Sequence, residues 1–148
     1  MPARAEQQFH HTEKWLMSVD SPAPRSRGLL WTGRVLSGLV GGFLLLDGVA
    51  KLFKPEPVVE GTVKLGYPES VIVPLGITLT VCSVLYLIPR TAILGAILLT
   101  GYLGGAIATH VRVGDDVFTI VFGAAFGVIV WLGLYLREPR LRALVPLR

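Results

Sequence analysis

Residues 71–109 read VIVPLGITLTVCSVLYLIPRTAILGAILLTGYLGGAIAT, and this stretch decides the fold. It contains two apolar runs, 71–88 and 91–109, which are separated only by Pro89-Arg90. Neither run contains a charged residue, and each approaches the roughly 20 residues that an α-helix needs to cross a bilayer. Lipid offers no hydrogen-bond partner to the backbone, so each run must be helical. The short connection then predicts an antiparallel helical hairpin inside a membrane.

Two further apolar runs flank this hairpin, at residues 29–53 and 117–136. The whole chain has 148 residues, of which 52% are hydrophobic and only 16% are charged. A soluble domain of this size has too much surface to be covered by so few charges. The sequence therefore predicts one all-α domain over residues 29–137, an integral membrane bundle of four transmembrane helices.

The segments outside the spans are more polar. Residues 1–28 are expected to form a flexible cytoplasmic tail, and residues 138–148 a basic cytoplasmic tail. The connection between the first two spans, residues 54–70, alternates valines with charged side chains around Glu60 and Lys64. This pattern is typical of a short amphipathic helix at the membrane interface.

Basic residues are distributed unequally between the two ends of the predicted bundle. The end with both termini has nine, and the other end has three: Lys54, Lys64 and Arg112. Because cytoplasmic loops carry an excess of lysine and arginine, this asymmetry predicts that both termini face the cytoplasm. The nine are Arg4, Lys14, Arg25, Arg27, Arg90, Arg137, Arg140, Arg142 and Arg148. Their position around apolar runs is typical of membrane orientation and not of a nucleic-acid surface, so no nucleic-acid partner is expected.

Three of the predicted spans contain glycines spaced four residues apart. Small residues let helix backbones approach closely in lipid, where apolar burial does not drive association. The sequence therefore predicts that these glycines mediate helix packing. They are Gly38 and Gly42 in the first span, Gly101 and Gly105 in the third, and Gly123 and Gly127 in the fourth.

Charged residues in and near the spans are the candidates for function. Asp47 lies near the outer end of the first span, and Lys51 follows on the same helical face. His110 and Arg112 end the third span on the same side. These four residues are expected to converge on a polar pocket. Three readings stay open: an ion pair that only fixes helix rotation, a ligand pocket, or a catalytic group.

Other polar residues have simpler interpretations. Arg34, Trp131, Tyr135 and Arg137 are expected to anchor the bundle at the cytoplasmic interface. The single cysteine, Cys82, lies in an apolar run and is expected to be buried. No metal site is predicted, because adjacent side chains such as His10-His11 diverge on a helix.

Several short motifs occur in order along the chain. They are Leu65-Gly66-Tyr67-Pro68-Glu69, Leu85-Tyr86-Leu87-Ile88-Pro89-Arg90, Leu94-Gly95-Ala96, Gly101-Tyr102-Leu103-Gly104-Gly105-Ala106 and Thr109-His110. With Arg34, Asp47-Gly48 and Lys51, they resemble the DoxX-like family of small four-helix bacterial inner-membrane proteins. Most such proteins have no assigned activity, and some relatives are described as scaffolds for redox-defence enzymes. Similar sequences often carry a glutamate in the second span, where this chain has Leu79.

The resemblance implies a multi-pass protein of the inner membrane that serves a redox or stress-response system. The chain has no evident nucleophile triad, metal cluster or nucleotide loop, which favours a non-enzymatic scaffold or small-ligand binder. One alternative is the membrane subunit of a quinone-linked oxidoreductase, with quinone as the candidate cofactor. Another is a small proton-coupled carrier that uses Asp47 and His110. The expected partners are the lipid bilayer and either a second copy of the chain or a redox protein.

Overall fold

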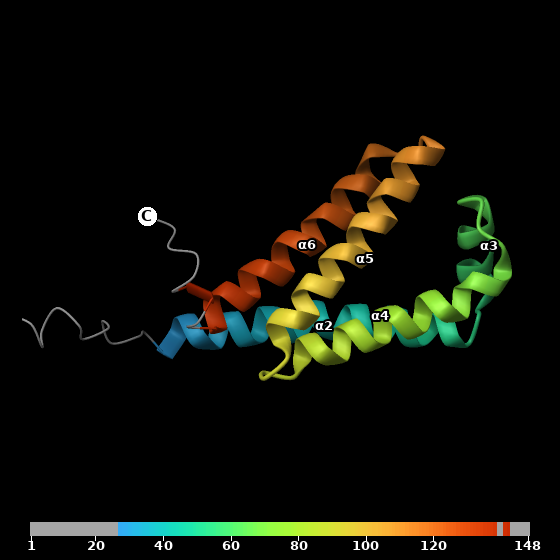
Figure 1. Ribbon diagram of the computed structural model, residues 1–148. Coiled ribbons are helices and arrows are strands. Elements are labelled where there is room, and N and C mark those ends of the chain that lie inside the picture. Colours follow the sequence, from blue (N-terminus) through green and yellow to red (C-terminus); the bar gives the residue numbers. More distant parts are fainter. Residues whose placement is uncertain (1–26, 139–140, 143–148) are drawn as a thin grey trace, which may run out of the picture.

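The computed structural model describes residues 27–138 and 141–142, and every regular element in this part of the chain is helical. Figure 1 shows how the long helices lie against one another and how a short helix lies at one end of the bundle. The elements are α2 (Arg27–Leu52), α3 (Glu56–Lys64), the 3-10 turn η1 (Glu69–Val71), α4 (Ile72–Leu87), α5 (Ala92–Val113) and α6 (Val117–Arg137).

The four long helices are long and apolar enough to cross a membrane. The prediction of an all-α bundle with four membrane-spanning helices is confirmed, and the protein is a multi-pass membrane protein. The predicted run 91–109 ends too early, because α5 continues to Val113 before Gly114 adopts a left-handed backbone conformation (φ 67°). A helix also forms at α3, as the connection between the first two spans predicts. Of the two predicted tails, residues 1–26, 139–140 and 143–148 lie outside the described residues.

The long helices form a ring in the order α2, α4, α5, α6, with contacts between each pair of neighbours. One end of the ring carries the turn between α4 and α5, and we call it the hairpin end. The other end carries α3 and the turn at residues 114–116, and we call it the α3 end. Figure 1 shows that α5 and α6 lean away from α2 and α4 toward the α3 end. The ring is therefore tight at one end and open at the other.

Close packing at the hairpin end depends on glycines. A methyl group at Gly95 would overlap the backbone of Tyr86, so α4 and α5 meet there at backbone distance. A methyl group at Gly33 would lie 2.8 Å from the Arg137 backbone nitrogen, and one at Gly133 would lie 2.6 Å from Ser37 Oγ. These contacts hold α2 against α6. Small side chains are what permits such close approach of helices in lipid.

The predicted packing glycines are a different set, and most of that prediction is wrong for contacts within this chain. A methyl group at Gly38, Gly42, Gly101 or Gly105 would meet nothing within 4 Å. A methyl group at Gly123 would meet only the Ile107 side chain, at 3.2 Å, and one at Gly127 would meet only the Leu103 side chain, at 4.0 Å. The packing face of α2 instead carries Gly33, Ser37, Gly41 and Gly48. Successive residues of an α-helix are rotated by about 100° about its axis. Glycines one position away from the packing residues therefore lie on another face of the helix.

A buried tyrosine joins three helices at the hairpin end. The Tyr86 hydroxyl on α4 lies 3.0 Å from Ser37 Oγ on α2 and 2.9 Å from the Val130 carbonyl oxygen on α6. The Arg137 guanidinium donates to the Tyr86 carbonyl oxygen at 2.6 Å and lies 5.0 Å from the centre of the Tyr86 ring. Arg137 was predicted as an interface anchor, but its contacts show that it also holds α6 against α4.

The other predicted anchors have separate surroundings. Trp131 donates from Nε1 to Thr100 Oγ1 at 2.9 Å, which joins α6 to α5. The Tyr135 carbonyl oxygen accepts a hydrogen bond from Arg142 Nε at 2.7 Å, and the Arg142 guanidinium lies over the Tyr135 ring. Arg34 is exposed on α2. Their depth in a bilayer stays a prediction. Cys82 is buried, as its apolar run predicts.

Candidate functional site

A cavity of about 480 Å³ occupies the open half of the ring, between the diverging helices. Its volume lies in the range of small-molecule sites, about 300–1,000 Å³. Apolar side chains form the inner walls, and polar side chains gather toward the α3 end. The apolar lining comprises Phe43, Leu44, Leu65, Leu75, Leu79, Leu103, Ala106, Phe122 and Phe126. The polar lining comprises Asp47, Lys51, Thr62, Tyr67, Tyr102, Thr109 and His110.

An ion pair on α2 contributes two of the polar side chains. The Lys51 ammonium donates to Asp47 Oδ2 at 2.5 Å, across one turn of the helix. The Lys51 side chain is 18% exposed and that of Asp47 is 40% exposed. The Lys51 stem packs against α4, because a methyl group at Gly76 would lie 2.8 Å from Lys51 Cβ. The pair is therefore fixed in position and keeps an accessible carboxylate at the cavity wall.

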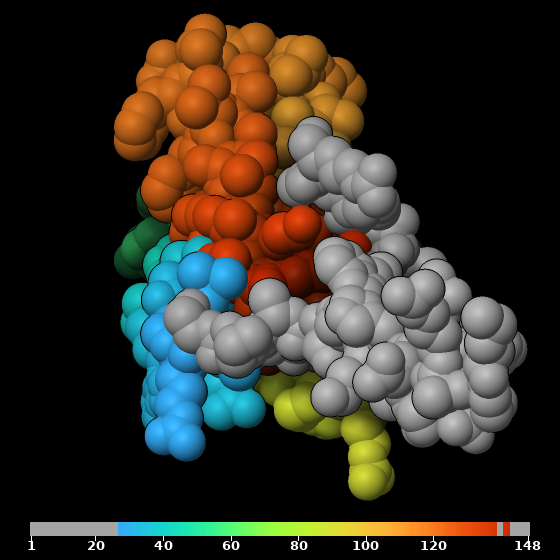
Figure 2. Space-filling model, turned by 90° about the vertical axis from the view of Figure 1, so that its left-hand side faces the viewer, coloured from blue at the N-terminus to red at the C-terminus, as the bar shows by residue number. Residues whose placement is uncertain are grey.

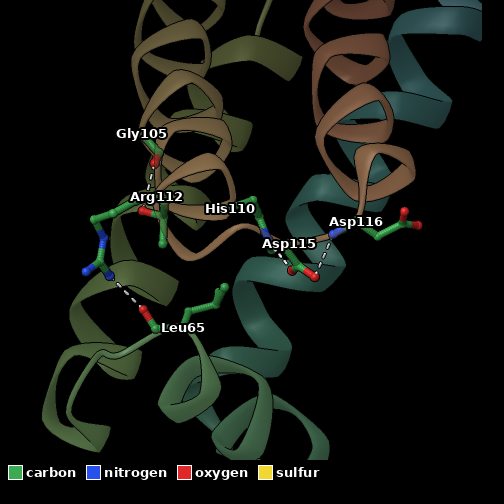
Figure 3. Close-up of polar contacts among 7 residues, drawn as sticks. Leu65, Gly105, His110, Arg112, Asp115 and Asp116 are labelled. Carbon is green, nitrogen blue, oxygen red and sulfur yellow. Dashed lines mark hydrogen bonds and ion pairs between the residues drawn. The ribbon is translucent and has the colours of Figure 1, made fainter.

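His110 reaches the cavity from α5 and is held by the following turn. Its Nδ1 lies 2.8 Å from Asp115 Oδ2, and Figure 3 shows the ring pointing toward that carboxylate. The hydrogen bond from His110, followed by that from the Asp116 backbone N–H, lowers the pKa of Asp115 below its ordinary value. Asp115 therefore stays ionised and orients the imidazole at neutral pH.

Arg112 does not line the cavity with Asp47, Lys51 and His110. Its guanidinium donates to the Leu65 carbonyl oxygen at 2.8 Å, on the opposite side of the helix end from His110 (Figure 3). The Tyr67 hydroxyl lies 2.9 Å from Thr109 Oγ1, and Thr109 donates to the Gly105 carbonyl oxygen at 2.9 Å. Together these bonds tie the chain after α3 to the end of α5. Arg112 thus closes the wall of the cavity without lining it.

Three of the predicted packing glycines line the cavity: Gly101, Gly105 and Gly123. Gly101 and Gly105 lie on α5 where it leans away from its neighbours, and both have open space where a side chain would begin. Their lack of side chains leaves volume inside the bundle. Leu79, which is near the place where similar sequences are expected to carry a glutamate, is fully buried at the cavity wall.

The structure brings together three of the four residues predicted to form a pocket: Asp47, Lys51 and His110. Sequence reasoning did not select Tyr67, Tyr102 or Thr109, which also line the cavity. All three belong to the short motifs quoted for the family resemblance, which were the available signal in the sequence. Tyr67 and Thr109 also contact each other. Their pairing across 42 positions depends on how the chain after α3 folds back.

A second, smaller cavity of about 280 Å³ lies beneath α3. It is lined by Pro57, Val58, Gly61 and Lys64, and by Asp115 from the α5–α6 turn. Four side chains line both cavities and form the wall between them: Lys51, Thr62, Leu65 and His110. Within the described residues, no group of three or more histidine, cysteine, aspartate or glutamate side chains is placed to hold a metal ion.

The four apolar helices and the internal cavity define a small multi-pass helical membrane protein with a polar end to its cavity. The chain belongs to the DoxX-like family, whose model matches residues 35–133. No curated protein and no solved structure matched the chain. The matched region contains the whole cavity lining and ends just before Leu134 in α6.

Proposed function

We propose that the protein is a non-enzymatic membrane component that binds one small amphipathic molecule in the larger cavity. The observation that carries this proposal is the separation of the lining into an apolar body and a polar end. An apolar tail fits against Phe43, Leu79 and Phe126, where it loses no hydrogen bonds. A head group with donors and acceptors fits near Asp47, Lys51 and His110. A few placed polar groups in an apolar cavity are typical of small-molecule sites.

Family membership supports the biological setting of this proposal. Some DoxX-like relatives are described as membrane scaffolds for redox-defence enzymes, and we propose a redox or stress-response setting in the inner membrane for this protein. A quinone is one molecule of the required class, because it combines a hydrogen-bonding ring with an apolar tail. A soluble redox enzyme or a second copy of this chain is the proposed protein partner.

The distribution of charge supports an orientation with both termini in the cytoplasm. Among the described residues, Arg27, Arg90 and Arg137 lie at the hairpin end, while Lys54, Lys64 and Arg112 lie at the α3 end. The hairpin end also carries the connections to the remaining basic residues of both terminal segments. In this orientation the polar end of the cavity faces the outer side of the inner membrane.

Mass spectrometry of the protein purified in mild detergent tests the binding function. We expect a stoichiometric amphipathic molecule in the wild type and its loss in Gly105→Leu, whose side chain enters the cavity. Gly104→Leu is the matched control, because Gly104 also has open space but does not line the cavity. Equal retention in both variants, or no bound molecule in the wild type, would contradict the proposal. Co-purifying redox proteins are identified in the same samples.

A further inference from the structure

The cavity wall between α4 and α5 is closely packed at three residues. Leu79 of α4 is fully buried, and Leu103 and Thr109 of α5 are 9% and 8% exposed. Beyond them, the Tyr67–Thr109 and Arg112–Leu65 hydrogen bonds tie the end of α5 to the chain before η1. At these positions a molecule cannot pass between the two helices without breaking packed contacts or hydrogen bonds.

The opposite wall, between α2 and α6, has an opening. Phe43 of α2 and Phe122 of α6 both line the cavity, yet they are 52% and 48% exposed. The Asp47 side chain also lines it and is 40% exposed. A side chain that is exposed while it lines a cavity borders an opening. Tyr67, 37% exposed, also does so, but it lies in the connection before η1 and not on a spanning helix. Figure 2, viewed from the hairpin end, shows α6 rising away from α2 with the green of α3 visible in the angle between them.

Phenylalanine rings run along the border of this opening. The rings of Phe118 and Phe122 lie 6.0 Å apart, those of Phe122 and Phe126 4.9 Å apart, and that of Phe126 lies 5.0 Å from Phe43. All four residues belong to helices that are long and apolar enough to span the membrane. The opening therefore faces acyl chains and not water, and its border is apolar except at Asp47.

We propose that the ligand is a molecule dissolved in the bilayer, with a single apolar tail and a hydrogen-bonding head, and that it enters laterally between α2 and α6. This inference rests on the binding function proposed above. The tail slides along the phenylalanine rings, and the head reaches the Asp47–Lys51 pair near the α3 end. A water-soluble ligand would instead enter at the α3 end, beside Tyr67 or through the smaller cavity and the wall formed by Lys51, Thr62, Leu65 and His110.

The test uses the full chain in phospholipid vesicles and a long-chain fatty alcohol that carries a photoreactive diazirine. Rapid mixing and a light flash at increasing delays give the rate at which peptides containing Leu75, Leu79 or Leu103 become labelled. Phe118→Trp narrows the lateral opening without changing a cavity-lining residue. Gly61→Leu fills the smaller cavity and has open space for its side chain. Val111→Trp, on an exposed position of α5, controls for added bulk.

Lateral entry predicts that Phe118→Trp lowers the labelling rate roughly tenfold while equilibrium labelling stays within about twofold of wild type. Gly61→Leu and Val111→Trp should label at the wild-type rate. Slower labelling in Gly61→Leu, or an unchanged rate in Phe118→Trp, would overturn lateral entry. If the wild-type cavity is not labelled at equilibrium, the proposed binding function itself is wrong. Failure of the binding function is therefore distinguishable from failure of lateral entry.

Competition shows which source supplies the ligand. Unlabelled fatty alcohol and a prenylated benzoquinone share the tail-and-head chemistry, and the stronger competitor identifies the source as a simple lipid or a quinone. Glycerol has hydroxyl groups but no tail, and it should not compete. Competition by glycerol at the concentration of the fatty alcohol would contradict the requirement for a membrane-dissolved tail.

Discussion

The hydroxyl of Tyr86 on α4 lies 3.0 Å from the hydroxyl of Ser37 on α2, and both side chains are fully buried. The same tyrosine hydroxyl lies 2.9 Å from the Val130 carbonyl oxygen on α6. A carbonyl oxygen only accepts, so the tyrosine proton goes to Val130 and the serine hydroxyl donates to the tyrosine. One side chain thus fastens three helices at the hairpin end, and the cavity lies in the half of the bundle beyond it.

Replacing Tyr86 with phenylalanine should loosen this end. The change removes both hydrogen bonds of the hydroxyl, so Ser37 and the Val130 carbonyl oxygen lose this partner. The free energy of unfolding should fall by about 1 kcal/mol. Thermal unfolding in detergent measures the loss. Tyr135→Phe is the control, because the contacts of Tyr135 with Arg142 use its ring and carbonyl oxygen, which remain. Equal melting of the two variants would show that the Tyr86 hydroxyl does not stabilise the bundle.

Two glycines of α5 should respond differently to the same substitution. Gly95→Ala places a methyl group on the Tyr86 backbone, and overpacking of this kind costs about 1–3 kcal/mol. Gly101→Ala meets open space and should be neutral or slightly stabilising, since alanine is the better helix former. Thermal unfolding of both variants distinguishes the packing glycine from the cavity-lining glycine. Greater loss in Gly101→Ala would reverse this assignment.

The Asp47–Lys51 pair is tested by removing the charges separately and together. Asp47→Asn leaves the largely buried Lys51 ammonium without its carboxylate, so expression and thermal stability should fall. Asp47→Asn combined with Lys51→Met should restore both, because no unpaired charge remains. The double variant should nevertheless lose the bound molecule if the pair contacts its head group. A double variant that folds and retains the molecule would show that the pair is structural only.

The Asp115 carboxylate should titrate differently when His110 is removed. The pKa of Asp115 is lowered chiefly by its hydrogen bond to His110, so His110→Ala should raise that pKa toward its ordinary value near 3.8. The sign follows from the lowered pKa in the folded state: the bond stabilises the α5–α6 turn above pH 3.8, and this stabilisation is lost as the pH falls through the folded-state pKa. Titration of the Asp115 carboxyl carbon by NMR measures both values. An unchanged pKa in His110→Ala would contradict the hydrogen bond.

The orientation is tested with alkaline-phosphatase fusions, which are active only outside the cytoplasm. A fusion after Pro57 in α3 should be active, and one after Arg148 should be inactive, because the basic residues favour cytoplasmic termini. The reverse pattern would place the polar end of the cavity at the cytoplasmic side.

The sequence by itself determined the number of membrane-spanning helices, their antiparallel hairpin and the short helix at α3. These features depend on local chemistry: lipid requires helical backbone over each apolar run, and Pro89-Arg90 leaves room only for a tight turn. The sequence also brought out Asp47, Lys51 and His110, because charged and titratable side chains are rare at such positions.

Only the tertiary structure decided which helix faces touch. Small residues occur on more than one face of α2 and α5, and spacing alone does not distinguish the packing set of Gly33, Ser37 and Gly41 from the exposed pair of Gly38 and Gly42. The cavity likewise exists because α5 and α6 lean away from α2 and α4, and helix directions follow from the sum of contacts between neighbours. The turn of Arg112 toward Leu65 and the pairing of Tyr67 with Thr109 depend on that same arrangement, which no local pattern in the sequence specifies.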